Sequence, residues 1–160
     1  MVDRAHAVDR FVRVLNADPS ATRQLGVWCR CPITARVTRR VWRAATPAEA
    51  DVLRIPPGAL VQDRAGTLRA TGGTVLSEIA ALVVAARVTP SMRAALDRSD
   101  VPLGVAIGAL RFRRQIVSQH APSAGPHVLH VRALLWAGGT PVAAVEEKYL
   151  TNVVLRWTGS

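Results

Sequence analysis

Two adjacent carboxylates, Glu146 and Glu147, lie near the end of an apolar stretch that follows the Gly138-Gly139 turn, and no other residues in the chain suggest chemistry as strongly. Burial among apolar groups disfavours the charged form of a carboxyl group. We therefore expect a glutamate at this position either to reach solvent or to take part in the chemistry of a functional site. Because strand side chains alternate between faces, only Glu146 or Glu147 can face the interior, and the sequence leaves that choice open.

Arginine dominates the basic residues and gives the chain a net charge of +10. Such a charge is typical of nucleic-acid binding. The arginines are scattered, however, and the only adjacent pairs are Arg39-Arg40 and Arg113-Arg114. Arginine also binds carboxylates in a bidentate manner, so we expect a small organic anion as the partner rather than nucleic acid.

The cysteines and histidines do not predict a metal site. Cys29 and Cys31 are expected within a strand, on one face, with poor geometry for a disulfide, and we interpret them as buried structural thiols. His127 and His130 are three residues apart in an expected strand, which places them on opposite faces.

The pattern of apolar residues predicts an α+β fold. Apolar residues at helical spacing predict a helix over 5–15, and a short helix is expected from about residue 20 to 25. Further helical pieces are expected at 90–97 and 102–109, with a loop or a turn of helix at 46–58. Strands are expected at 27–45, 60–69, 74–88, 110–118, 127–136 and 141–154. These elements predict one antiparallel sheet of about six strands with helices packed on one side.

Length and composition suggest a single domain over residues 1–160. The hydrophobic content of 49% argues against disorder, and no apolar run is long enough to span a bilayer. The N-terminus lacks the apolar segment of a signal peptide. We therefore expect a cytoplasmic protein that does not enter a membrane.

Several short motifs follow one another along the chain, namely Ser20-Ala21-Thr22-Arg23-Gln24-Leu25, Leu68-Arg69-Ala70-Thr71-Gly72-Gly73, Val101-Pro102-Leu103-Gly104, Gly139-Thr140-Pro141 and Glu147-Lys148-Tyr149-Leu150. In their order and spacing, from about residue 18 to 150, the chain resembles the chorismate pyruvate-lyase family. The resemblance implies a buried pocket closed by flap-like helix-turn segments. It also implies cofactor-independent conversion of chorismate to 4-hydroxybenzoate and pyruvate.

Counting along the family motifs gives candidate site residues. The resemblance places the catalytic pair at Arg64 and Glu147, with Arg64 binding a substrate carboxylate and Glu147 acting as a general acid. It implies substrate contacts through the backbone near Ala21 and Leu103. The remaining candidate binding residues are Gly104, Arg114 and Glu146.

Two alternatives stay open. The polar strand around Arg64, with Asp63 beside it, suggests an enzyme of the same fold with another substrate, such as a cyclase or isomerase in specialised biosynthesis. The other alternative is a non-catalytic module that binds a small anion, related to the effector domains of bacterial transcription regulators. About 20 residues precede the expected fold, too few for a winged helix, so this alternative predicts a free-standing binding protein.

Overall fold

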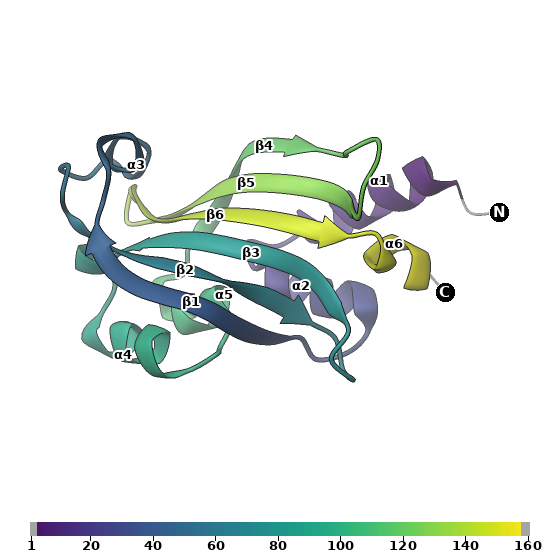
Figure 1. The fold of residues 1–160 in the computed structure, drawn as a ribbon, viewed down its shortest axis with the longest axis horizontal. Helices are drawn as coiled ribbons and strands as arrows, with labels where there is room; N and C mark the ends of the chain where they lie inside the picture. The colour runs from purple at the N-terminus through teal and green to yellow at the C-terminus, as the bar shows by residue number, and fades with distance from the viewer. Residues whose placement is uncertain (1–2, 158–160) are drawn as a thin grey trace.

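The computed structural model describes residues 3–157, in which six strands form one antiparallel sheet (Figure 1). The strands are β1 (Thr34–Ala44), β2 (Leu60–Arg69), β3 (Val75–Val84), β4 (Arg113–His120), β5 (His127–Ala137) and β6 (Thr140–Leu150). Their order in the sheet is β1-β2-β3-β6-β5-β4. Two three-stranded halves, each consecutive in the chain, therefore meet where β3 pairs with β6.

Most helices cover one face of the sheet, and Figure 1 shows α2 and α5 behind the strands. The short α3 packs on the opposite face, where Leu53 belongs to one cluster with Val61 and Val84. The α-helices are α1 (Arg4–Leu15), α2 (Ala21–Cys29), α3 (Pro47–Leu53), α4 (Pro90–Arg98), α5 (Leu103–Ala106) and α6 (Asn152–Arg156), and two 3₁₀ turns are η1 (Ala85–Arg87) and η2 (Gly108–Leu110). The expected α+β class with helices on one side is confirmed, with α3 as the exception. Within residues 3–157, no helix is long and apolar enough to cross a membrane.

Local capping explains why the helices begin where they do. The Ser20 hydroxyl accepts from the Arg23 amide at the start of α2. At the start of α3, the Thr46 side chain accepts a hydrogen bond from the Glu49 amide, and the Glu49 side chain accepts one from the Thr46 amide. This reciprocal pair is a capping box. This capping box makes part of 46–58 a regular helix.

The largest core lies between α1, α2 and the end of the sheet where β6 finishes. The Phe11 ring of α1 meets Trp28 of α2 and Tyr149 of β6 edge to face, with centroid distances of 5.3 and 5.1 Å. Trp28 also donates its indole N–H to the Val153 carbonyl of α6 at 2.8 Å. These contacts fix α1, α2 and α6 against the sheet, which sets the position of the α2 N-terminus.

Two expectations about local structure are wrong. The first concerns Cys29 and Cys31, because α2 continues to Cys29 and β1 begins only at Thr34. Cys29 is buried and Cys31 is half-buried. Burial, reinforced by the neighbouring Cys31, raises the pKa of Cys29 to about 12. Both thiols are free, and Cys29 belongs to the main core.

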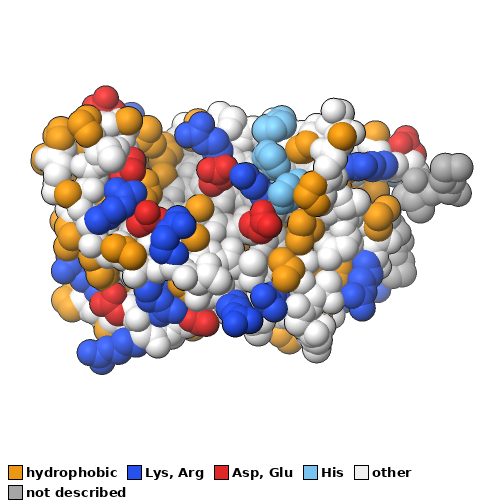
Figure 2. Space-filling model, in the orientation of Figure 1, with side chains coloured by type: hydrophobic (Ala, Val, Ile, Leu, Met, Phe, Trp, Pro, Cys, Tyr) orange, Lys and Arg blue, Asp and Glu red, His pale blue; other side chains and the backbone are white. Residues whose placement is uncertain are grey.

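The second concerns His127 and His130, whose rings lie on the same face with centroids 5.2 Å apart. A register shift between His127 and Leu129 in the β5–β6 pairing breaks the alternation of side chains. His120 of β4 also contacts His130, with centroids 4.8 Å apart. Figure 2 shows histidines beside interspersed acidic and basic side chains on the face that the main helices leave uncovered.

Candidate functional site

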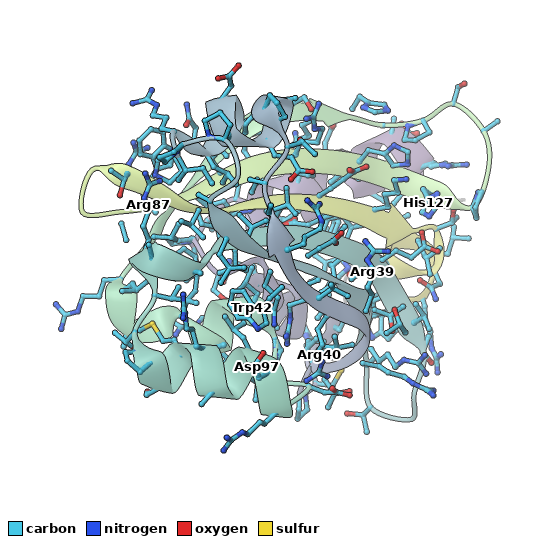
Figure 3. All side chains as sticks on the ribbon, turned by 60° about the vertical axis from the view of Figure 1, so that its left-hand side comes forward. Arg39, Arg40, Trp42, Arg87, Asp97 and His127 are labelled. Carbon is cyan, nitrogen blue, oxygen red and sulfur yellow. The ribbon has the colours of Figure 1, made fainter. Side chains whose placement is uncertain are left out.

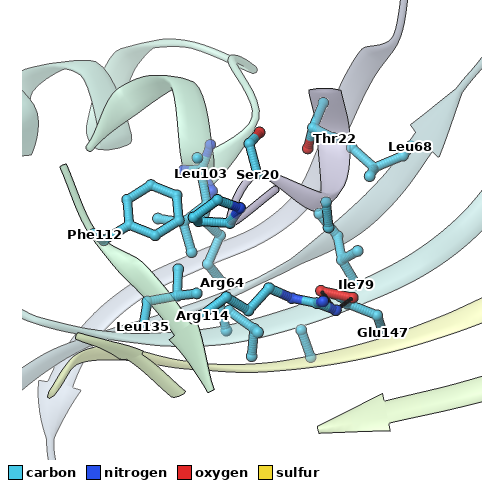
Figure 4. Close-up of a pocket in the computed structure, with 16 residues that line it drawn as sticks. Ser20, Thr22, Arg64, Leu68, Ile79, Leu103, Phe112, Arg114, Leu135 and Glu147 are labelled. Atoms are coloured by element: carbon cyan, nitrogen blue, oxygen red, sulfur yellow. Dashed lines mark hydrogen bonds and ion pairs between the residues drawn. The ribbon is translucent and has the colours of Figure 1, made fainter. Parts of the chain in front are cut away.

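A cavity lies between the helix-covered face of the sheet and the starts of α2 and α5 (Figure 4). Its empty volume is about 600 Å³, including space that opens to solvent. Strands β2 to β6 all contribute to its floor, and the segments around Ser20 and Gly104 form its roof. The wall is mainly apolar, with side chains from Leu68, Ile79, Leu103, Phe112, Leu135 and Val145. Its charged residues are Arg64, Arg114 and Glu147.

Glu147 points into this cavity and Glu146 does not. Glu147 is a buried residue, and its Oε2 accepts from Arg114 Nη2 at 2.6 Å and from the Tyr149 hydroxyl at 2.7 Å. Glu146 is half-exposed, lies 3.7 Å from Lys148 and does not line the cavity. The alternation along β6 thus selects Glu147, and Glu146 has no direct part in this site.

Arg114 and Glu147 form a buried ion pair rather than two separate groups. Their side chains are 4% and 8% exposed. Arg114 Nη1 also donates to Asn16 Oδ1 at the end of α1, at 3.1 Å. The Arg114 Nε atom is buried and has no hydrogen-bond partner among the described residues. A buried N–H without an acceptor is costly, and this one belongs to a side chain that lines the cavity.

Tyr149 completes this network from the main core. The side chain is fully buried, and burial followed by the nearby Glu147 carboxylate raises the pKa of the Tyr149 hydroxyl well above its usual value. The hydroxyl therefore stays protonated and acts as a donor to Glu147. The Tyr149 hydroxyl donates to Oε2 of Glu147, while Arg114 Nη2 donates to both oxygens of that carboxylate.

Arg64 lines the same cavity and is 3% exposed. Its guanidinium donates to the carbonyls of Leu96 at 2.7 Å and Val101 at 2.9 Å. Within residues 3–157, no carboxylate lies within ion-pair distance of it. Burial, followed by repulsion from Arg40, lowers the pKa of Arg64, and the Asp100 carboxylate offsets part of this effect. The cavity thus contains a buried cation that has carbonyl partners and, among the described residues, no directly paired carboxylate.

The carbonyls that Arg64 binds belong to the end of α4 and the loop that leads to α5. Arg40, the cross-strand neighbour of Arg64, donates to the carbonyls of Asp97 and Ser99 in the same segment. Figure 3 shows Arg40 and Trp42 of β1 beside Asp97, whose carboxylate accepts the Trp42 indole N–H. The two guanidinium groups therefore fix the segment before α5, and with it one side of the cavity roof.

The roof contains the remaining residues expected at the site. Ala21 is the first residue of α2, and Leu103 and Gly104 begin α5. Of the α2 amides, those of Arg23 and Gln24 are bonded to Ser20. The amides of Ala21 and Thr22 have no acceptor within the helix, which leaves them free for an acceptor in the cavity. The structure thus brings together Arg64, Glu147, Arg114, Ala21, Leu103 and Gly104.

The sequence did not point to Tyr149 or Asn16 as part of the site. Tyr149 is two residues from Glu147 in the same strand, so the period of two could have placed both on one face. Asn16 ends α1 and lies 98 residues from Arg114 in the chain. Only the packing of α1 against the sheet brings Asn16 to the site, and no local pattern indicates it.

No protein-family model and no curated protein sequence matches this chain. Solved structures do resemble it. The alignment with PhnF from Mycobacterium smegmatis has a TM-score of 0.66 and 14% identity, and it covers 84% of this chain but only 65% of that one. With the effector domain of the same protein the TM-score is 0.65, at 14% identity, and the coverage is 84% and 90%. The C-terminal domain of the histidine utilization repressor from Pseudomonas syringae gives a TM-score of 0.59 at 18% identity, with 75% and 92% covered.

At these identities the likeness establishes the fold alone, which is chorismate lyase-like. The expectation of an enzyme is wrong, and membership of the chorismate pyruvate-lyase family is not confirmed. These and other solved structures that resemble the chain are named as transcriptional regulators or as their effector or ligand-binding domains. The contacts agree with this correction, because Glu147 is paired with Arg114 and is not an isolated acid in an apolar pocket.

Proposed function

We propose that this chain is a non-catalytic module that binds a small organic anion in the cavity between the sheet and the α2 and α5 starts. The observation that carries the proposal is the buried Arg64 guanidinium, which lines the cavity without a carboxylate partner. A buried charge that lacks a counter-charge is costly. An anionic ligand would supply a counter-charge and so reduce that cost, and the free energy recovered would contribute to the affinity of the ligand.

The remaining groups support a ligand that is part polar and part apolar. Arg114 Nε is a second unused donor, and the free amides of Ala21 and Thr22 lie at the N-terminal end of the α2 dipole, which favours negative charge. Leu103 and Gly104 would contact the ligand from the other side of the roof. Glu147 then acts as a positioning residue that holds Arg114. Apolar walls around a few polar groups are typical of small-molecule sites.

The solved structures support a sensing role for this module. Two of them are named as the effector domain or the ligand-binding domain of a regulator. We propose that residues 1–160 form one domain with the corresponding role of reporting the presence of a metabolite. Binding without chemical change is the expected behaviour, so the ligand should be recovered intact after incubation with the protein.

Isothermal titration of the protein with benzoate and with benzamide tests the proposal. The two molecules have nearly the same shape, and only benzoate carries the charge. We expect benzoate to bind at least about tenfold more tightly, because charge-assisted hydrogen bonds are worth about 1.5–3 kcal/mol. Arg64→Gln should remove this preference.

The matched control is Arg98→Gln, which removes an exposed guanidinium of α4 that lies outside the cavity. It should leave the preference for benzoate unchanged, and thermal unfolding should confirm that both variants fold. Equal binding of benzoate and benzamide, or no binding of either, contradicts the proposal.

A further inference from the structure

An open groove continues from the cavity across the surface between α2 and η2. Five residues line both spaces, namely Pro19, Ser20, Thr22, Gly104 and Phe112. The groove then runs on past residues outside the first cavity, including Gly26, Ile33, Gly108 and Arg111. A ligand that enters the cavity therefore has a surface channel directly beside its binding site.

The boundary between the cavity and the groove is thin and is built around a glycine. A Cβ atom at Gly104 would lie 3.5 Å from Phe112 Cζ and 3.5 Å from Ser20 Oγ. Gly104 thus has no side chain between the Phe112 ring and the Ser20 hydroxyl, and Figure 4 shows these two side chains in the same part of the roof. Gly104 therefore lies at the point where the cavity and the groove share their lining residues.

The groove carries more positive than negative charge. Its charged residues are Asp18, Arg23 and Arg111. Asp18 is already engaged, because Oδ1 accepts from the Ser20 amide at 2.8 Å and Oδ2 lies 3.8 Å from Arg23. Within residues 3–157, the Arg111 side chain makes no hydrogen bond or ion pair, and it is exposed.

The backbone of Arg111 is fixed by a turn. Its φ angle is 51°, in the left-handed region, and its amide donates to the Gly108 carbonyl at 3.0 Å. Arg30 and Arg54, which follow α2 and α3, have the same C-cap conformation. The turn sets the position from which the Arg111 side chain leaves the backbone, one residue before Phe112 of the roof.

We propose that the ligand is an elongated organic dianion. One anionic group binds in the cavity, and a second, carboxylate or phosphate, lies in the groove at Arg111 with support from Arg23. This inference rests on the proposed function, because the first anionic group occupies the cavity assigned there. It adds a second binding site and a minimum length for the ligand.

Calorimetric titration with two series of linear acids tests the proposal. The monoacids are hexanoate, octanoate and decanoate, and the diacids of equal length are adipate, suberate and sebacate. Above a threshold length, the diacid should bind about three- to fivefold more tightly than its monoacid, the value of a partly exposed ion pair. Arg111→Gln should reduce this ratio to about one, Arg23→Gln should lower it in part, and Arg98→Gln should leave it unchanged.

The outcomes separate this inference from the proposed function. If monoacids bind but no diacid binds more tightly at any length, the second site is refuted and the cavity assignment stands. The same holds if Arg98→Gln lowers the diacid preference as much as Arg111→Gln does. If neither series binds to the wild-type chain, both the dianion inference and the small-anion module are overturned.

Discussion

The buried pair of Arg114 and Glu147 gives the sharpest test of how this site is built. Replacing Glu147 by Leu leaves the Arg114 guanidinium buried without its counter-charge, and replacing Arg114 by Met leaves the Glu147 carboxylate in the same situation. Breaking a buried pair from one side costs about 3–5 kcal/mol. The free energy of unfolding of a domain is about 5–15 kcal/mol in total, so either single variant should be visibly unstable.

The double variant with both substitutions should be much more stable than the sum of the two losses. It leaves no unpaired charge, and apolar side chains of similar volume often replace a buried pair without loss. The Tyr149 hydroxyl would then lack its acceptor, which costs about 1–3 kcal/mol. Adding Tyr149→Phe should recover that part as well.

Urea unfolding followed by tryptophan fluorescence measures these free energies in a double-mutant cycle. We expect a coupling energy of at least about 2 kcal/mol between Arg114 and Glu147. The neighbouring Glu146→Leu is the matched control. It should cost less than about 1 kcal/mol, because within the part of the chain that the structure describes Glu146 forms only an exposed ion pair with Lys148. Additive losses in the double variant would refute the reasoning.

Three further predictions concern the scaffold. A Cβ at Gly66 would overlap a backbone carbonyl of the adjacent strand β1, so Gly66→Ala should lower the free energy of unfolding by more than about 2 kcal/mol. Gly108 has open space around it, so Gly108→Ala should change that free energy by less than about 1 kcal/mol. Chemical denaturation measures both values. Because the pKa of Cys29 is raised to about 12, Cys29 should resist iodoacetamide in the native protein at pH 8.5 while Cys31 reacts. Mass spectrometry of the modified peptides measures the extent of labelling at each cysteine. Equal labelling of the two cysteines would contradict this prediction. Burial, followed by His120 and His127, lowers the pKa of His130, so the folded state favours the neutral ring and stability should fall as pH decreases below about 6.5. His130→Gln should flatten this pH dependence of thermal unfolding, and an unchanged slope would disprove the role of His130.

Much of the fold was predictable because the local patterns are strong. The helix at the N-terminus, the strand over 60–69 and the final hairpin all lie close to their expected positions. The misplaced elements have local causes. α2 continues through Trp28 to Cys29 because its buried side packs on α1 and α6, and the register shift at His127 depends on pairing with β6.

The residues around the cavity were predictable in part. Arg64, Glu147 and Arg114 do face one cavity, since a period of two along each strand fixes their direction. Their contacts were not predictable. Arg64 is bound to the carbonyls of the α4–α5 segment, and Glu147 is paired with Arg114, because those partners come from elements far away in the chain.

The sequence by itself determined an α+β chain with one antiparallel sheet, and the alternation that allows only one of Glu146 and Glu147 to face inward. Both are consequences of local periodicity and turn chemistry, which act between residues close in the chain. Only the tertiary structure decided which charges are compensated. Pairing depends on which strands and helices become neighbours, so the packed fold alone gives Glu147 a guanidinium partner and leaves Arg64 buried without a carboxylate.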